Sequence, residues 1–183
     1  MQKNSLIASG IATSILLSLA TTVTTVEIAQ AQKAQRPVPL LNAKCVNSGL
    51  GTAREQNLDV SIGRAVYTSQ FYLGPGYRSA SLTCNIKPEN RPQSVFQTLN
   101  LGFGMRDNST NSTTVEVKVY LDGKQAENRT VAPGQPTTLA LDVSNVSNVA
   151  VEAVCSNQSQ YCDRIYFFTA SLERPTAPQP VKK

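Results

Sequence analysis

The 183-residue chain contains no histidine and no tryptophan. The lack of histidine excludes Ser-His-Asp and Cys-His nucleophile systems, and it removes the commonest side-chain ligand of transition metals. No glycine-rich phosphate loop follows an expected strand, which argues against nucleotide chemistry. The lack of tryptophan leaves six tyrosines and five phenylalanines as the aromatic side chains. The chemistry open to this chain is therefore narrow, and we expect no cofactor.

Paired carboxylates are a catalytic set that this composition still permits, because a glycosidase needs only two of them. The four candidates are Asp107, Asp122, Asp142 and Asp163. Each stands beside a turn signal, and aspartate is favoured in turns because its side chain bonds the local backbone. A calcium site built from Asp107, Asn108 and Asn111 is an alternative, since hard cations bind carboxylate and amide oxygens. The turn interpretation is favoured over both, so we expect neither an enzyme nor a metal site.

The chain shows no helical stripe of apolar residues, whereas the alternation typical of strands recurs along most of it. Residues 58–62 alternate apolar and polar side chains, and residues 65–73 are rich in aromatic and β-branched ones. Nine strands are expected at residues 58–62, 65–73, 77–86, 97–103, 115–121, 124–130, 137–142, 149–155 and 164–171. Short strands separated by turn signals predict an all-β fold, an antiparallel β-sandwich or jelly roll.

The clearest local prediction is a hairpin over residues 115–131. Val115, Val117 and Val119 fall on one face by the two-residue period, and the polar residues between them fall on the other. Asp122 and Gly123 suit a type I′ turn, in which both central residues take positive φ. We therefore expect one face of this hairpin to pack on the core.

The N-terminal residues 1–31 are predicted to be a secretory signal peptide. Lys3 supplies a positive start, an uncharged apolar run follows, and Ala29 and Ala31 fit the small-x-small cleavage rule. The apolar run is diluted by threonines before it reaches the roughly 20 residues of a membrane span, so no stable span is expected after processing. Residues 32–42 are expected to be a flexible leader, 43–173 the sandwich domain, and 174–183 a proline-rich flexible tail.

All four cysteines lie after this cleavage point. An even number of cysteines in an exported chain predicts two disulfides, and hence a secreted or periplasmic, extracytoplasmic location. The sequence allows three connectivities. The pairing Cys45–Cys84 with Cys155–Cys162 is favoured because the second pair can close one loop between strands. A zinc site is disfavoured, since the cysteines lack the short C-x2-C spacing.

Charge is unevenly distributed along the chain. Residues 43–173 contain 11 basic and 11 acidic residues, so the net charge of +5 comes from the ends. Nucleic-acid binding needs a basic face that neutralises phosphates, and a neutral body does not supply one. No nucleic-acid partner is expected.

Aromatic residues near turns are the sequence's candidates for a sugar site. Tyr72, Tyr77 and Tyr161 lie at expected strand ends or loops, with Arg78 and Arg164 beside them. Exposed rings can stack on sugar faces while the arginines donate hydrogen bonds. The alternative is that each tyrosine covers the core with its ring and leaves its hydroxyl in water.

Residues 58–172 resemble the NPCBM family, carbohydrate-binding modules first noted beside glycoside hydrolases. The matching pieces are Val60 to Tyr67, Phe96 to Asp107, Val117 to Lys124, Leu139 to Ser144 and Val149 to Glu152. The resemblance implies a galactose-binding-like jelly roll. The sequence departs from the family pattern at two places. The family commonly has a histidine after the first aromatic strand, where this chain has Phe71 to Pro75. It also has a tryptophan near the last strand, where this chain has Tyr166 to Phe168.

These observations together predict a secreted, non-catalytic binding module that recognises a carbohydrate of the cell envelope or extracellular matrix. The alternative is a structural or protein-interaction sandwich of the envelope without a sugar site, whose partner would be an envelope protein. A small glycosidase is a third hypothesis, which would need two carboxyl groups facing one cleft.

Overall fold

A computed structural model describes residues 36–91, 94–109 and 112–175 of the protein. The predicted signal peptide lies outside the described residues, as does nearly all of the predicted tail. Within the described residues the strands are β1 (Val38–Pro39), β2 (Lys44–Gly49), β3 (Thr52–Ile62), β4 (Ala65–Gly74), β5 (Ser79–Asn85), β6 (Thr98–Gly104), β7 (Val115–Leu121), β8 (Lys124–Val131), β9 (Pro136–Asp142), β10 (Asn148–Cys155) and β11 (Ile165–Glu173), with one short 3-10 helix, η1 (Leu40–Asn42).

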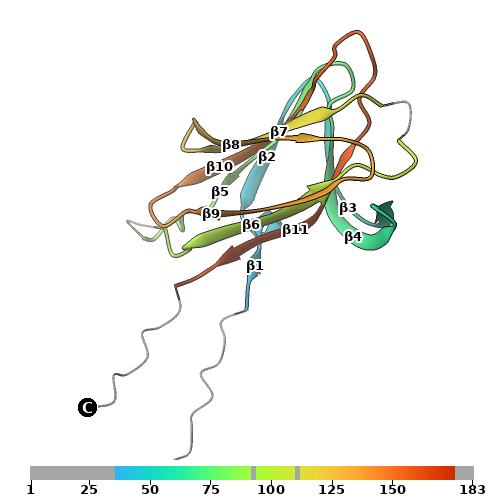
Figure 1. The fold of residues 1–183 in the computed structure, drawn as a ribbon. Coiled ribbons are helices and arrows are strands. Elements are labelled where there is room, and N and C mark those ends of the chain that lie inside the picture. Colours follow the sequence, from blue (N-terminus) through green and yellow to red (C-terminus); the bar gives the residue numbers. More distant parts are fainter. Residues whose placement is uncertain (1–35, 92–93, 110–111, 176–183) are drawn as a thin grey trace, which may run out of the picture. The chain divides into compact units, whose positions relative to one another are not determined.

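The strands form two antiparallel sheets that stack as a sandwich (Figure 1). The first sheet has the order β3-β4-β11-β6-β9, with β1 also paired to β11. The second has the order β2-β5-β10-β7-β8. The prediction of an all-β antiparallel sandwich is therefore confirmed, and the nine expected strands correspond to β3 through β11.

The core lies between the sheets and is made by alternate residues of both. Val115, Val117 and Val119 of β7 are fully buried, as the two-residue period predicted. Across from them, Phe167 of β11 stacks on Phe71 of β4 with ring centroids 4.4 Å apart. Both sheets thus bury their inner faces, and the loops at the two ends of the sandwich are left free to vary.

A second, smaller cluster lies on the outer face of the first sheet. The end of the β3–β4 hairpin packs over this face, where it buries Val60, Ile62, Tyr72 and Tyr166. The hairpin comes so close that a Cβ added to Gly104 of β6 would lie 2.8 Å from Ile62 Cγ2. Because β4 pairs with β11 only at residues 71–73, it leaves the rest of that edge open, and β1 pairs there with Ser171 and Leu172.

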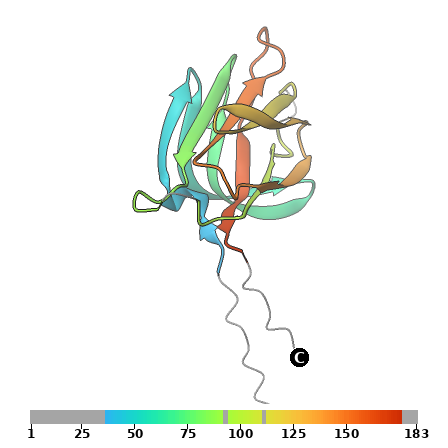
Figure 2. The same ribbon diagram turned by 90° about the vertical axis from the view of Figure 1, so that its left-hand side faces the viewer.

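The N-terminal boundary of the sandwich lies earlier than the sequence suggested. Residues 32–42 were expected to be a flexible leader, but Val38 and Pro39 pair with β11 and Leu40 is 1% exposed. Figure 2 shows β1 beside the end of β11. That part of the prediction is wrong for two reasons. Proline is tolerated in edge strands, so Val38 and Pro39 can form a short one, and Leu40 beside them anchors the segment in the core.

The turn between β7 and β8 has the geometry expected from Asp122 and Gly123. Their φ angles are 47° and 80°, so both central residues lie in the left-handed region. Replacing Gly123 by valine is expected to lower the free energy of unfolding by about 1 to 2 kcal/mol, because a β-branched residue is strained at positive φ. The matched control is Gly123→Asn, because asparagine tolerates positive φ, and thermal unfolding of both variants measures the difference. Equal unfolding midpoints for Gly123→Val and the unmodified protein would contradict the assignment.

Two disulfides cross-link the described residues, and they have the pairing favoured from the sequence. Cys45–Cys84 joins the opposed residues of β2 and β5, and Cys155–Cys162 closes the loop between β10 and β11. Two disulfides are typical of proteins that fold outside the cytoplasm. In the described part of the chain, no helix is long and apolar enough to cross a membrane.

Candidate functional site

The connections β4–β5, β6–β7 and β10–β11 are among those that meet at one end of the sandwich. The strand register fixes this, because Ile165 at the start of β11 pairs with Leu73 at the end of β4, and Tyr166 pairs with Gly104 at the end of β6. The β10–β11 connection rises at the top of Figure 1, away from β1. We call this the loop end.

Two exposed tyrosines project from the loop end. Tyr77 of the β4–β5 connection is 56% exposed and Tyr161 of the β10–β11 connection is 55% exposed. Their rings make an edge-to-face contact, with centroids 5.6 Å apart and planes at 80°. A backbone bridge explains why they meet, since Cys162 N–H donates to Gly76 O at 2.9 Å and each tyrosine is the chain neighbour of one of these residues. The Cys155–Cys162 disulfide holds the same loop.

A polar cavity of about 290 Å³ adjoins Tyr161. Its lining residues are Asn108, Ser109, Ser112, Tyr161 and Asp163. They combine one exposed ring with hydroxyl, amide and carboxylate groups, which can donate and accept hydrogen bonds beside an apolar surface. Small-molecule sites typically pair apolar surface with a few convergent polar groups in this way.

Asp163 holds the cavity's polar groups in place. Its Oδ2 accepts hydrogen bonds from Ser109 Oγ at 2.5 Å and from Arg106 Nη2 at 3.1 Å, and its Oδ1 accepts one from the Arg164 N–H at 2.7 Å. Its own backbone N–H donates to Ser112 Oγ at 2.9 Å. Asp163 therefore ties the β6–β7 connection to the β10–β11 connection.

Protonation of Asp163 should loosen this arrangement. Burial raises the pKa of the carboxyl, but the hydrogen bonds from Ser109, Arg164 and Arg106 outweigh it and hold the pKa below its ordinary value of 3.8. A lowered pKa gives stability that is present above the ordinary value and lost as pH falls through the folded-state value. The unfolding midpoint of Asp163→Asn should therefore lie below that of the unmodified protein at pH 7, and the gap should narrow below about pH 4. A gap independent of pH would contradict this role.

The structure separates the other sequence candidates from this cavity. Tyr72 is 4% exposed, so its prediction as a ligand-binding residue is wrong: the β3–β4 hairpin covers its ring. Arg164 is half-buried and lies over that same ring, with its guanidinium carbon 4.4 Å from the centroid. Arg78 is exposed and directly follows Tyr77, so it alone of the two arginines remains a candidate beside the aromatic pair.

The four candidate carboxylates serve as anchors of turns. Asp107 accepts hydrogen bonds from Ser61 Oγ and from the Gly63 and Arg64 N–H groups, and so holds the tip of the β3–β4 hairpin. Asp142 and Asp122 likewise accept hydrogen bonds from backbone N–H groups of nearby loops. No group of three or more cysteine, aspartate or glutamate side chains that could hold a metal ion is found among the described residues, and Asn111 of the alternative calcium site lies outside them.

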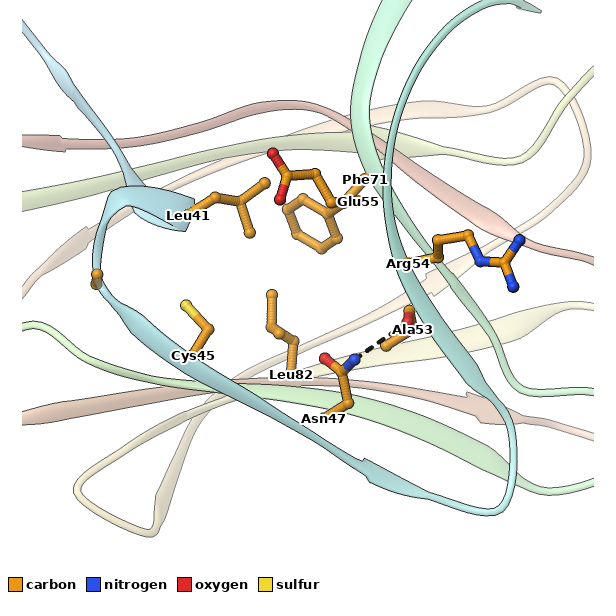
Figure 3. Close-up of a pocket in the computed structure, with 9 residues that line it drawn as sticks. Leu41, Cys45, Asn47, Ala53, Arg54, Glu55, Phe71 and Leu82 are labelled. Carbon is orange, nitrogen blue, oxygen red and sulfur yellow. Dashed lines mark hydrogen bonds between the residues drawn. The ribbon is translucent and has the colours of Figure 1, made fainter.

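A second cavity lies between the edge strands β2 and β3 (Figure 3). It measures about 250 Å³, and Leu41, Phe71 and Leu82 line its interior. Asn47 Nδ2 donates to Ala53 O at 3.2 Å across the gap between the strands. Phe71 is 1% exposed, so this cavity presents no open ring on which a sugar could stack. The cavity beside Tyr161 is therefore the better candidate.

No protein-family model matches the chain, and no curated protein is similar to it in sequence. Solved structures do share its fold. One is the second CBM51 module with the INT domain of ZmpB from Clostridium perfringens, solved with GlcNAc: its TM-score is 0.62 at 13% identity, over 77% of this chain and 32% of that one. Another is the CBM51 module of a Clostridium perfringens GH95 protein with methyl-galactose, at TM-score 0.58 and 10% identity, over 75% of this chain and 99% of that one.

A third is the tandem CBM51 pair of a family 98 glycoside hydrolase from Streptococcus pneumoniae, at TM-score 0.54 and 9% identity, over 76% of this chain and 50% of that one. The chain shares the β-sandwich fold of these CBM51 modules. The chain spans about a third of the length of the ZmpB structures, so it corresponds to one module of a larger protein there. Identities of this size establish the architecture alone.

Proposed function

We propose that this protein is a secreted, non-catalytic carbohydrate-binding module that holds a glycan of the cell envelope or extracellular matrix at its loop end. The observation that carries the proposal is the exposed Tyr161 ring beside a cavity lined by hydroxyl, amide and carboxylate groups. Two modules of the same fold were solved with sugars, GlcNAc and methyl-galactose. The sequence motifs described above support the narrower NPCBM assignment within this fold.

Each part of the site has a role in this proposal. The Tyr161 ring stacks on the apolar C–H face of a sugar ring. Asp163 Oδ1 accepts hydrogen bonds from the sugar hydroxyls, and the Asn108 amide accepts from them or donates to them. Asp163 is the charged residue among those that line the cavity. Its carboxylate is paired with Arg106 Nη2 at 3.1 Å, so the lining of the cavity carries no excess positive charge that would select an acidic sugar, and a neutral sugar is favoured. The two disulfides and the predicted signal peptide support secretion.

The competing hypothesis is an envelope sandwich that binds a protein and has no sugar site. Burial of all three candidate tyrosines would have favoured it. Tyr72 is buried, but Tyr77 and Tyr161 are each more than half exposed. An open aromatic pair beside a polar cavity is better explained by a sugar than by a flat protein interface.

Titration calorimetry of the oxidised protein with neutral monosaccharides and oligosaccharides tests the proposal. Tyr161→Ala is expected to weaken binding about 5-fold, because the loss of a stacking ring costs about 1 kcal/mol. Tyr120→Ala is the matched control, since Tyr120 lies on the outer face of the second sheet, where its hydroxyl donates to Glu152 Oε2 at 3.0 Å. The proposal would be refuted if the unmodified protein bound no sugar in calorimetry and no glycan on an array.

A further inference from the structure

Two serine hydroxyls that line the cavity beside Tyr161 have already donated their hydrogens. Ser109 Oγ donates to Asp163 Oδ2 at 2.5 Å, and Ser112 Oγ donates to Thr113 O at 3.0 Å. A hydroxyl has one hydrogen to donate and two lone pairs that can accept. Both serines can therefore only accept hydrogen bonds from a ligand.

The Asp163 carboxylate is a further acceptor with an open position. Within the described part of the chain, its Oδ2 accepts from Ser109 Oγ and Arg106 Nη2, whereas its Oδ1 accepts from the Arg164 N–H alone. Each carboxylate oxygen has room for about two donors, so Oδ1 keeps one position. The side chain is 22% exposed. Burial raises the pKa of this carboxyl, but its hydrogen bonds outweigh burial and keep the pKa below 3.8, so at neutral pH the group accepts and does not donate.

Few side chains of the cavity can donate to a ligand. Among the described residues that line it, those with a side-chain N–H or O–H not given to Asp163 or Thr113 are Asn108 and Tyr161. No lysine or arginine belongs to that described lining. A ligand group that only accepts hydrogen bonds, such as a sulfate or a methylated oxygen, is therefore poorly matched to this wall.

The open acceptors lie on one wall because Asp163 joins them. Its backbone N–H donates to Ser112 Oγ at 2.9 Å, and its side chain accepts from Ser109 Oγ. Hydroxyls on adjacent carbons of a sugar ring also lie side by side, so such a pair suits Ser112 Oγ and Asp163 Oδ1 together. A site that accepts from a ligand hydroxyl rejects an analogue without it, because the buried acceptor then loses water and gains no partner.

We propose that this cavity selects its ligand by accepting hydrogen bonds, and that the ligand class is a neutral sugar with unsubstituted hydroxyls on two adjacent ring carbons. This inference rests on the proposed sugar-binding function. Ser112 and Asp163 determine the specificity. A sugar that is deoxygenated, methylated, acetylated or sulfated at these two hydroxyls leaves them without a donor and is excluded.

NMR titration of the unmodified, oxidised protein tests the inference with two parent sugars, methyl β-galactoside and methyl N-acetyl-β-glucosaminide. Each parent is compared with analogues in which one hydroxyl at a time is replaced by hydrogen or by fluorine. Fluorine cannot donate a hydrogen bond, so both replacements should weaken binding equally where the hydroxyl donates to the protein. We expect a loss of about 10-fold at two adjacent ring positions of the parent that binds more tightly.

The analogues distinguish the possible outcomes. Fluorine restores part of the affinity where a hydroxyl accepts from the protein, so restoration at every sensitive position would overturn the inference while sugar binding stands. Equal affinity of a parent and all its analogues would overturn it as well. If neither parent binds, the inference falls, and the absence of binding on a glycan array would then overturn the proposed function too.

A serine variant tests the acceptor role of Ser112 separately from its structural role. Ser112→Ala should weaken binding of the parent sugar about 5-fold and leave unchanged the affinity for the analogue that lacks the matching hydroxyl. Ser159→Ala is the matched control, because Ser159 is exposed on the connection that carries Tyr161 and does not belong to the described lining of the cavity. An equal loss for the parent and every analogue would mean that Ser112 acts only through the loop structure, and would overturn its role as an acceptor.

Discussion

Replacing Cys45 and Cys84 together by alanine is expected to lower the free energy of unfolding by about 4 kcal/mol, because the bond closes a long loop in the unfolded chain. The two cysteines are separated by 39 positions and lie opposite each other on β2 and β5. Losing the bond also frees β2, which is one of the two edge strands of its sheet. Urea unfolding of the oxidised proteins measures the difference.

The Cys155→Ala/Cys162→Ala double variant is the matched control, because its cysteines are separated by only 7 positions. Its expected loss is smaller, about 2.5 kcal/mol, since a shorter loop has less entropy to lose. The effects on the proposed sugar binding should have the opposite order: loss of Cys155–Cys162 should weaken binding more, because this pair restrains the loop that carries Tyr161, whereas Cys45–Cys84 lies away from the loop end. A larger stability loss for the shorter loop would contradict the chain-entropy explanation.

The second large effect is expected at Phe167, where alanine should lower the free energy of unfolding by about 3 to 5 kcal/mol. Phe167 is fully buried, stacks on Phe71 at 4.4 Å and lies 5.3 Å from the Phe103 ring. Removing its ring leaves a cavity between three strands of the first sheet. Phe167→Leu, which keeps most of the volume, should lose less than half as much. Chemical denaturation of both variants measures this, and a loss below 1 kcal/mol for Phe167→Ala would mean that the site can collapse.

The regular part of the fold could be predicted from the sequence because alternation is a local signal. Val115, Val117 and Val119 identify their strand and its buried face, and Asp122-Gly123 identifies the turn that follows. Strand β2 was missed because its residues Asn47, Ser48 and Gly49 are poor strand formers. It exists because it pairs with β5 and is cross-linked to it, which no local pattern reveals.

The site was harder to predict because it depends on contacts between distant loops. Tyr72, Tyr77 and Tyr161 look alike in sequence, and only the position of the β3–β4 hairpin decides that Tyr72 is buried. Asp163 and Asn108 were noticed, but as candidates for catalysis and calcium binding. Their joint position beside Tyr161 follows from hydrogen bonds between the β6–β7 and β10–β11 connections, more than 50 residues apart.

The pairing of β1 with the last residues of β11 determines how this module can be presented. Val38 lies opposite Leu172, so the chain enters and leaves the sandwich at the same end, and the Tyr77–Tyr161 pair lies at the other end. Anything attached at either flank would leave the aromatic pair unobstructed. The same adjacency makes the sandwich suitable as a cassette, which can be inserted into a surface loop of another protein without separating the two points of attachment.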